Sequence, residues 1–584
     1  MRAGRRIPAG VALATLAVTL LAVPATGVTS CGMAGVPAVD GPYPVVREAA
    51  AIQVRDGEVR SAWIDKPSAP APPGGWPVIM QLHGGAAFAN DPRNDVVPAE
   101  VQWAYACRGY VVVSYLRRGY PGIVTTNPAT TVNPNAPNRA TTTGWDYGGP
   151  LDVGDAQDVL SWVLANEPVN ADRVGATGGS QGGFTTYAFA GQEPRLRTIV
   201  PSGVYDSWNA NQVRKGVTSP GCAGLVIAAG LLTTTTPEWA AQQCALNAQA
   251  VANGGDTNDY FWQRAPARWA PQITVPVLNV QNPQDPNWNI SGILRLHGLL
   301  PNPHNKLFVG PAAIHVNVPV PQRLAYYSLV QRWWDYWLKD VDTGVDAEPK
   351  VTWAAPPSNR ASATAPYTWG YGTTSLACGA ARAAVYLADG ERLADQPGTA
   401  APQLFLNNGA SGSANLATLG TAVTETPVDT AVYRTEPFAE DTLIVGDVRL
   451  RLALTSLSAR YQLHPDLYEV HPDGTSRRIY DIAALNIGPL VPYGVFDGVP
   501  GADKVVSWAA HTTVYRMWAG DRLELRLSSA NRASWIPEPS PGGFLLNRDA
   551  ARPSTLTFDA LPASRLDWSN AGCPAAAGLR TVED

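Results

Sequence analysis

The sequence has little excess charge, and no long apolar run follows its first segment. Lys and Arg together number 43 against 48 Asp and Glu, which gives a formal net charge of −5 at pH 7. Without a basic surplus, nucleic acid is not expected as a partner. After the N-terminal segment no run reaches roughly 18 apolar residues, so no stable membrane span is expected in the mature chain.

Metal-binding patterns are also scarce. The chain of 584 residues has seven histidines, with no His-rich cluster and no Cys-x-x-Cys pair. We therefore predict no metal and no cofactor. Its share of hydrophobic residues is 45% and its share of charged residues 16%, which is typical of a globular protein rather than a disordered one. The length allows two or three domains.

The first segment, residues 1–30, is typical of a signal peptide. A positively charged start precedes an apolar stretch at residues 9–23, and small residues follow. We therefore expect a secreted, extracellular protein. One alternative is a single N-terminal membrane anchor. Another is a lipid anchor through Cys31, because residues 28–31 resemble a bacterial lipoprotein cleavage site.

Cysteine usage is consistent with export. An even number of cysteines, six, favours disulfides in an oxidising compartment. Sequence alone does not give their connectivity. The pairs that we consider are Cys222 with Cys244, Cys378 with Cys573, and Cys31 with Cys107 unless Cys31 is lipidated.

Residues 40–350 show the pattern of an α/β catalytic domain. Short apolar runs alternate with helix-length segments, which predicts a parallel sheet covered on both faces. A partly helical insert at residues 205–269 is expected to form a cap over the sheet. The strands are predicted at residues 77–82, 109–115, 173–178, 198–201, 276–280 and 306–310, and the clearest helices at 151–166 and 324–338.

The pattern changes in residues 351–584. Helical periodicity fades, and alternating runs such as 448–454 and 522–527 are separated by Gly, Pro, Asn and Asp. This pattern predicts a C-terminal all-β domain, a jelly roll or β-sandwich.

The central chemical signal is Gly178-Gly179-Ser180-Gln181-Gly182-Gly183, which contains the pattern Gly-x-Ser-x-Gly. It lies directly after a predicted strand and before a predicted helix, as a nucleophile elbow requires. Gly178 and Gly182 leave room for the sharp turn that exposes the serine. Ser180 is therefore the predicted nucleophile, and a purely structural turn is the alternative.

A serine nucleophile needs a base, and the base needs an acid to orient it. In this fold the chain order is Ser, then Asp or Glu, then His, and catalytic groups follow the carboxyl ends of strands. His315 follows the strand at 306–310, whereas His304 precedes it. Asp285 follows the strand at 276–280 in the same way. We predict His315 as the base and Asp285 as its partner.

Two backbone N–H groups should form the oxyanion hole. One belongs to Gln181, the residue after the nucleophile. The other should come from the loop after the first parallel strand, where Gly85 is favoured and Ala86 is the near alternative. His83, at the start of that loop, is expected to support it rather than to transfer protons.

Several segments resemble the family of X-prolyl dipeptidyl aminopeptidases and cocaine esterase-type (CocE/NonD) hydrolases. They are Ala-Thr-Gly-Gly-Ser-Gln-Gly-Gly at 176–183, Ile-Thr-Val-Pro-Val-Leu at 273–278, Trp-Trp-Asp-Tyr-Trp-Leu-Lys at 333–339, and two stretches at 437–446 and 519–525. The resemblance implies an α/β-hydrolase core, a helical cap and a C-terminal jelly roll, and places the triad on Ser180, Asp285 and His315. Cocaine esterase-like members use a tyrosine hydroxyl in the oxyanion hole, whereas this chain has His83-Gly84-Gly85. A tryptophan commonly precedes their acid, whereas Pro283 and Gln284 stand here.

The sequence thus predicts an exported serine hydrolase that cleaves a small ester, amide or peptide substrate through an acyl-enzyme. An X-Pro-type exopeptidase is the first alternative, and acidic cap residues such as Asp206 and Glu238 could then bind the substrate amino terminus. A catalytically silent carbohydrate-binding protein is the second. The Trp-rich helix at 333–337 is expected to pack against the sheet and the jelly roll. The substrate's acyl group and the oligomeric state are not predicted.

Overall fold

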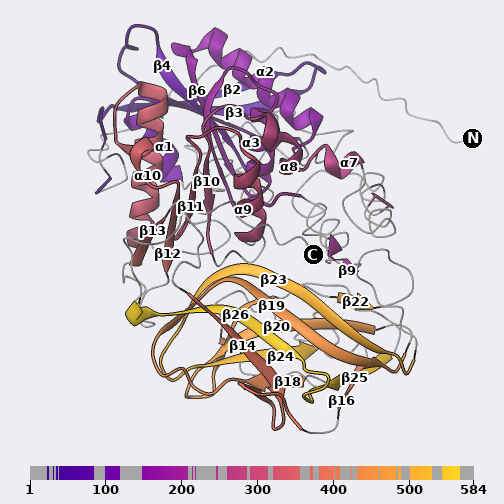
Figure 1. Cartoon of the computed structure of the whole chain (residues 1–584). Coiled ribbons are helices and arrows are strands. Elements are labelled where there is room, and N and C mark those ends of the chain that lie inside the picture. Colours follow the sequence, from indigo (N-terminus) through magenta and orange to yellow (C-terminus); the bar gives the residue numbers. More distant parts are fainter. Residues whose placement is uncertain are drawn as a thin grey trace, which may run out of the picture.

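The chain folds into an α/β part followed by a β part in a computed structural model (Figure 1). The residues that the structure describes are 23–24, 31, 35–36, 38–84, 99–118, 146, 148–207, 213–214, 217–218, 242, 245–246, 259–283, 285, 290–312, 320–355, 368–372, 380–399, 402–407, 422–423, 431–458, 461–481, 485–487, 500–528 and 542–565.

An 11-stranded sheet forms the centre of the first part. From β5 to β12 neighbouring strands run parallel, while β1, β2 and β3 at one edge and β13 at the other pair antiparallel. The strands, in spatial order, are β1 (Val23–Pro24), β2 (Val45–Gln53), β3 (Val59–Pro67), β5 (Val111–Tyr115), β4 (Trp76–Leu82), β6 (Val169–Gly179), β7 (Leu196–Ser202), β10 (Leu278–Gln281), β11 (Lys306–Val309), β12 (Val351–Ala355) and β13 (Thr368–Gly372).

All six strands predicted from apolar runs are present in this sheet. The antiparallel edges were not predicted, because polar and small residues interrupt the apolar pattern in partly exposed β2 and in buried β3. β12 pairs with β11 and β13 pairs with β12, so the first sheet extends to Gly372, past the predicted domain boundary at residue 350.

Helices cover both faces of the sheet. Alternate residues of β4 point to opposite faces of the sheet. Val78 and Met80 pack with α2 and α3 on one face, and Ile79 packs with α1 and α10 on the other. On the face covered by α1 and α10, Trp333 and Trp334 are fully buried, so the Trp-rich helix packs on the sheet as predicted. The helices are α1 (Ala99–Cys107), α2 (Pro150–Asn166), α3 (Gln181–Ala190), α7 (Asp259–Trp262), α8 (Pro266–Trp269), α9 (Ile290–Leu299) and α10 (Val320–Lys339), with 3-10 turns η2 (Ala270–Gln272), η3 (Val345–Ala347) and η4 (Ala563–Arg565).

The second part is built on a largely antiparallel 13-stranded sheet with its own apolar core. This confirms an all-β C-terminal part, while the jelly-roll arrangement stays a prediction. Its strands are β14 (Ala381–Ala388), β15 (Arg392–Ala394), β16 (Gln403–Asn407), β17 (Ala422–Val423), β18 (Ala431–Arg434), β19 (Thr442–Ser456), β20 (Tyr461–Val470), β21 (Ser476–Asp481), β22 (Leu485–Ile487), β23 (Asp503–Met517), β24 (Arg522–Ser528), β25 (Gly542–Asn547) and β26 (Thr555–Pro562).

The two parts share apolar surface. Leu443 of β19, Val514 of β23 and Leu561 of β26 belong to the same buried cluster as the core of the first part. Figure 1 shows β23 on the side of the β part that faces the α/β part, and α9 contacts β23. Burial of this surface stabilises the two parts as one unit.

Outside the two sheets, the predicted cap lies mainly beyond the described residues. Within residues 205–269 the structure gives α7, α8 and a two-stranded pair, β8 (Val213–Arg214) with β9 (Val217–Thr218). In the described part of the chain, no helix is both long and apolar enough to cross a membrane. A disulfide joins Cys31 to Cys107, with their Cα atoms 5.6 Å apart. The other two cysteine pairs considered, Cys222–Cys244 and Cys378–Cys573, lie outside the described residues.

Candidate active site

Ser180 occupies a strained turn between β6 and α3. Its backbone dihedral angles are φ 54° and ψ −130°, an unusual conformation for a residue other than glycine. Such backbone strain costs on the order of 1–3 kcal/mol and persists only where the surroundings enforce it. The Ser180 N–H donates to the carbonyl of Ser202 at 2.9 Å, and the Ser180 carbonyl accepts from the Phe184 N–H at 3.2 Å. The turn is therefore fixed on both sides.

The glycines around Ser180 allow backbone segments to touch. A Cβ on Gly178 would lie 2.6 Å from the carbonyl oxygens of Gly182 and Leu82. A Cβ on Gly182 would lie 2.0 Å from the Leu82 oxygen and 2.8 Å from the His83 oxygen. Both positions admit only glycine, since the opposing atoms are backbone. The first turn of α3 thus rests directly on the end of β4.

Asp285 lies at the same edge of the sheet as Ser180. In register, Gly179 on β6 pairs with Ser202 on β7, and Ser202 pairs with Val280 on β10. At about 4.8 Å per strand, β6 and β10 are therefore about 10 Å apart. Asp285 follows β10, is 7% exposed, and accepts a hydrogen bond from the Gln281 amide at 3.2 Å.

His315 lies outside the described residues, but the strand before it is in place. The Gly310 N–H donates to the Gln281 carbonyl at 2.9 Å, and the Asn282 amide donates to the Ala312 carbonyl at 2.7 Å. The loop that holds Asp285 is thus bound to the chain just before His315. Its role as base stays a prediction.

Two other histidines near β11 have different surroundings. His304 stands before β11 and contacts Asp346, with Nδ1 to Oδ1 at 2.7 Å, at the opposite edge from Ser180. His297 is in α9, where burial lowers its pKa from 6.5 to about 4. Its Nδ1 lies 3.4 Å from the Asn279 amide nitrogen.

One of the two predicted oxyanion donors, Gln181, lies where α3 meets the end of β4. Gln181 is buried and is the first residue of α3, where the positive end of the helix dipole favours a developing negative charge. Gly85 and its alternative Ala86 lie outside the described residues. The loop that contains them begins at His83 and Gly84, which are buried.

His83 is a neutral, structural histidine. Its Nε2 accepts the Arg117 backbone N–H at 3.0 Å, so the ring proton is on Nδ1, which is 2.8 Å from the Gly84 carbonyl. Burial, and then the nearby Arg117 guanidinium, hold its pKa well below the usual value. This environment suits the supporting role expected for His83.

Asp206 is already neutralised. Arg295 of α9 donates to both of its carboxylate oxygens, at 2.5 Å and 2.9 Å. Such a bidentate pair leaves the carboxylate little capacity for a substrate ammonium. The other acidic candidate of the cap, Glu238, lies outside the described residues.

Sequence reasoning missed a set of buried charges behind the site. Arg117 and Arg118, which follow β5, contact Asp152 and Asp155 on α2 at 3.2 Å and 2.7 Å. Burial raises the pKa of Asp155 to about 6, although Arg60 and Arg118 oppose the shift. The available signal was two arginines together and two aspartates three positions apart, a pattern equally common on solvated surfaces.

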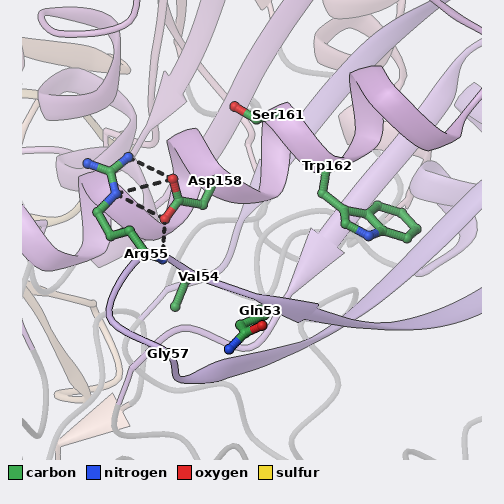
Figure 2. Close-up of a pocket in the computed structure, with 7 residues that line it drawn as sticks. All are labelled: Gln53, Val54, Arg55, Gly57, Asp158, Ser161 and Trp162. Carbon is green, nitrogen blue, oxygen red and sulfur yellow. Dashed lines mark hydrogen bonds and ion pairs between the residues drawn. The ribbon is translucent and has the colours of Figure 1, made fainter.

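A shallow hollow lies between α2 and the hairpin that joins β2 to β3 (Figure 2). In it Arg55 pairs with Asp158, from Nη2 to Oδ1 at 2.8 Å, and this exposed pair contributes little to stability. The Ser161 hydroxyl at its rim donates to the Gln157 carbonyl at 2.7 Å. These residues belong to neither the Ser180 turn nor the Asp285 loop.

Among the described residues, Glu469, His471 and Asp521 bring ligand-type atoms within 4.8 Å of one another. The two ring nitrogens of His471 face different carboxylates, Nδ1 that of Asp521 at 3.4 Å and Nε2 that of Glu469 at 3.9 Å. The Tyr515 hydroxyl also donates to Glu469 at 2.8 Å. These groups belong to the β part and to neither the Ser180 turn nor the Asp285 loop.

Comparison with known proteins adds family evidence to this geometry. The family model of the X-Pro dipeptidyl-peptidase (S15 family) matches residues 66–317, and that of the X-Pro dipeptidyl-peptidase C-terminal non-catalytic domain matches residues 343–567. An uncharacterized peptidase, YuxL of Bacillus subtilis (strain 168), is 23% identical over 231 residues. That match spans 39% of this chain and 29% of the length of the relative.

Solved structures share the fold over most of the chain. A CocE/NonD family hydrolase from Staphylococcus aureus has a TM-score of 0.63 at 14% identity, covering 89% of this chain and 94% of that one. An aminopeptidase from a marine sediment Thaumarchaeota archaeon has a TM-score of 0.64 at 15% identity, covering 89% and 97%. An alpha-amino acid ester hydrolase has a TM-score of 0.61 at 16% identity, covering 92% and 100%. At these identities the likeness shows the α/β-hydrolase fold with its C-terminal domain.

Proposed function

Because the chain belongs to the X-Pro dipeptidyl-peptidase (S15) and CocE/NonD hydrolase family, we propose that it is a serine hydrolase that cleaves ester or amide bonds through an acyl-enzyme on Ser180. The observation that carries the proposal is the Ser180 turn. A non-glycine residue at positive φ stands between a buried strand and a helix, with neighbouring glycines in backbone contact. This is the geometry that presents a serine hydroxyl for nucleophilic attack.

The proposed reaction is a two-step acyl transfer. His315 takes the Ser180 proton as Oγ bonds to the substrate carbonyl carbon, and Asp285 stabilises the imidazolium. The N–H groups of Gln181 and Gly85 bind the oxyanion. The imidazolium then protonates the leaving group as its bond breaks. Water, deprotonated by His315, releases the acid and restores Ser180, and no cofactor takes part.

A small ester or amide is the first substrate class that we propose. The pairing of Asp206 with Arg295 removes one of the two carboxylates considered for binding a substrate ammonium. The X-Pro exopeptidase alternative is supported by the family model over residues 66–317. A catalytically silent carbohydrate-binding protein is the remaining alternative, which would leave the strain at Ser180 without a function.

Export is part of the proposal. A disulfide between Cys31 and Cys107 suits an oxidising compartment. The same bond occupies the thiol that a lipid anchor would need, so it favours a secreted protein over one anchored through Cys31. The mass of residue 31's peptide from a native source, with and without reduction, separates the two: a diacylglyceryl adduct would refute the secreted form.

The decisive experiment compares Ser180→Ala with the parent protein on short-chain nitrophenyl esters and on free and N-blocked X-Pro anilides. Ser161→Ala, at the hollow of Figure 2, is the matched control because it removes a serine hydroxyl outside the site. We expect Ser180→Ala to lose turnover and labelling by a fluorophosphonate, with Ser161→Ala unaffected. Equal activity in Ser180→Ala and the parent would refute the assignment.

The substrate panel also separates the alternatives. Preference for anilides with a free amino terminus, lost on N-blocking, would favour the exopeptidase. Turnover of esters irrespective of the amine would favour the esterase. Neither turnover nor labelling, together with measurable sugar binding, would favour the carbohydrate-binding alternative.

A further inference from the structure

Arg117 lies between the two backbone segments of the predicted oxyanion hole. Its side chain is buried, and it donates to the Gly84 carbonyl from Nη2 at 3.3 Å and to the Thr185 hydroxyl from Nη1 at 3.0 Å. Gly84 begins the loop after β4, and Thr185 is in the first turns of α3. Asp152, 3.2 Å from Nη1, supplies the opposite charge.

The Gly84 carbonyl is held by a second contact that also depends on Arg117. His83 Nδ1 lies 2.8 Å from this oxygen, and the Arg117 backbone N–H fixes the His83 ring through Nε2 at 3.0 Å. Arg117 therefore acts on the Gly84 carbonyl both directly and through His83.

Through Thr185, Arg117 is also linked to Gln181, the residue after the nucleophile. The Thr185 hydroxyl accepts from Arg117 and donates to the Gln181 carbonyl at 3.1 Å. A path of hydrogen bonds thus joins the Gly84 peptide to Gln181 through one planar guanidinium. A lysine ammonium has a different shape and cannot reproduce this arrangement of donors.

We propose that Arg117 is a positioning residue for the oxyanion hole: it fixes Gly84 after β4 and the start of α3 relative to each other, and so orients the Gln181 N–H. The proposal rests on the proposed serine-hydrolase function. Arg117 contacts no reacting atom. Its effect should therefore appear in stabilisation of the tetrahedral intermediate and not in binding of the substrate ground state.

Two neighbouring arginines give a matched test. Arg117→Lys keeps the charge beside Asp152 but loses the bridge to Gly84 and Thr185. Arg118→Lys is the control, because Arg118 is equally buried and pairs with Asp155 at 2.7 Å and Asp56 at 2.6 Å. A general loss of packing should affect both variants alike.

Two neighbouring threonines give a second, milder test, in case Arg117→Lys does not fold. Thr185 and Thr186 are both fully buried, and each donates to the carbonyl four residues earlier, at 3.1 Å and 2.8 Å. Thr185 alone of the two has a bond from Arg117. Thr185→Val therefore breaks the path to α3, and Thr186→Val is its control.

The readouts are kcat and KM for p-nitrophenyl butyrate, the rate of inactivation by a fluorophosphonate, and the melting temperature. For Arg117→Lys we expect kcat and the inactivation rate to fall by about 10- to 100-fold with KM within threefold, since one oxyanion donor contributes about 10²–10³ in rate. Thr185→Val should lower kcat by about 3- to 10-fold, and both controls should stay within threefold of the parent.

Equal losses in each variant and its control, or a kcat of Arg117→Lys within threefold of the parent, would overturn the proposal. A change confined to KM would also overturn it, because it would mean an effect on substrate binding. Ser180→Ala in the same series keeps the outcomes distinct. If Ser180→Ala is inactive and Arg117→Lys is normal, only the positioning role fails, whereas an active Ser180→Ala refutes the function itself.

Discussion

Replacing Gly182 by alanine tests whether the Ser180 turn needs direct backbone contact. The added Cβ would lie 2.0 Å from the Leu82 oxygen, whereas real Cβ atoms essentially never come closer than 3.0 Å. The first turn of α3 and the end of β4 must then separate by about 1 Å or more, because neither contact is a flexible side chain. Gly182 lies two residues after Ser180, so the nucleophile and the Gln181 N–H move with it.

The expected consequence is a large loss of rate. A misplacement of about 1 Å in a catalytic site can lower the rate about 10²-fold, and overpacking typically destabilises a protein by about 1–3 kcal/mol. We therefore expect Gly182→Ala to fold with a lower melting temperature and to lose at least about 100-fold in kcat on nitrophenyl esters. The gain in helix propensity from Gly to Ala, about 1 kcal/mol, offsets only part of the strain.

Gly298→Ala is the matched control. Gly298 is also in a helix, α9, but a Cβ there would meet nothing within 4 Å. We expect this variant to keep full activity and to gain up to about 1 kcal/mol in stability. If Gly182→Ala retained kcat within threefold of the parent, the elbow would not depend on this contact and the reasoning from steric exclusion would be refuted.

Three further predictions concern Asp285, the partly buried His297 and the disulfide between Cys31 and Cys107. Asp285→Asn should lower kcat by about 10³-fold or more with little change in melting temperature, because the imidazolium loses its counter-charge, and an unchanged kcat would exclude Asp285. Burial lowers the pKa of His297 to about 4 in the folded chain, from 6.5 in the unfolded chain. Below about pH 6.5 the unfolded chain therefore binds a proton that the folded chain does not bind. The free energy of unfolding is highest above that pH and falls as the pH drops toward 4. Urea unfolding should therefore show about 1–2 kcal/mol of acid destabilisation between pH 7 and pH 5 that is absent in His297→Gln. Joint replacement of Cys31 and Cys107 by serine should lower stability by about 2–4 kcal/mol, measured as the urea midpoint, and no change would mean that the bond contributes nothing.

The parallel sheet and the Ser180 turn could be predicted because their signals are local. Continuous apolar runs mark strands that are buried on both faces, and the glycines of an elbow stand within two residues of the nucleophile. The order of elements then placed Asp285 at the correct edge of the sheet. The sequence pattern did not show that β12 and β13 join the first sheet, because an alternating strand at a sheet edge has the same pattern whichever sheet it joins.

Roles that depend on tertiary partners could not be predicted. Asp206 looked available for an amino terminus, but Arg295, distant in sequence, occupies it through a bidentate pair. For His83 the sequence predicted a supporting role but not the contacts that produce it. Its contacts with Arg117 and Gly84 fix its tautomer and occupy both ring nitrogens.

Arg117 and Arg118 show why adjacent identical residues can differ in function. Both follow β5 and both pair with α2, where Asp152 and Asp155 stand three positions apart on one helix face. Besides Asp155, Arg118 forms an ion pair with Asp56 on the β2–β3 hairpin, away from the nucleophile. Besides Asp152, Arg117 forms hydrogen bonds with Gly84 and Thr185, on the two segments beside Ser180. Since each buried pair must stay intact to avoid an uncompensated charge, α2 is fixed to the sheet at two points. Under the proposed positioning role, replacing Arg117 should lower both stability and kcat, whereas replacing Arg118 should lower stability alone.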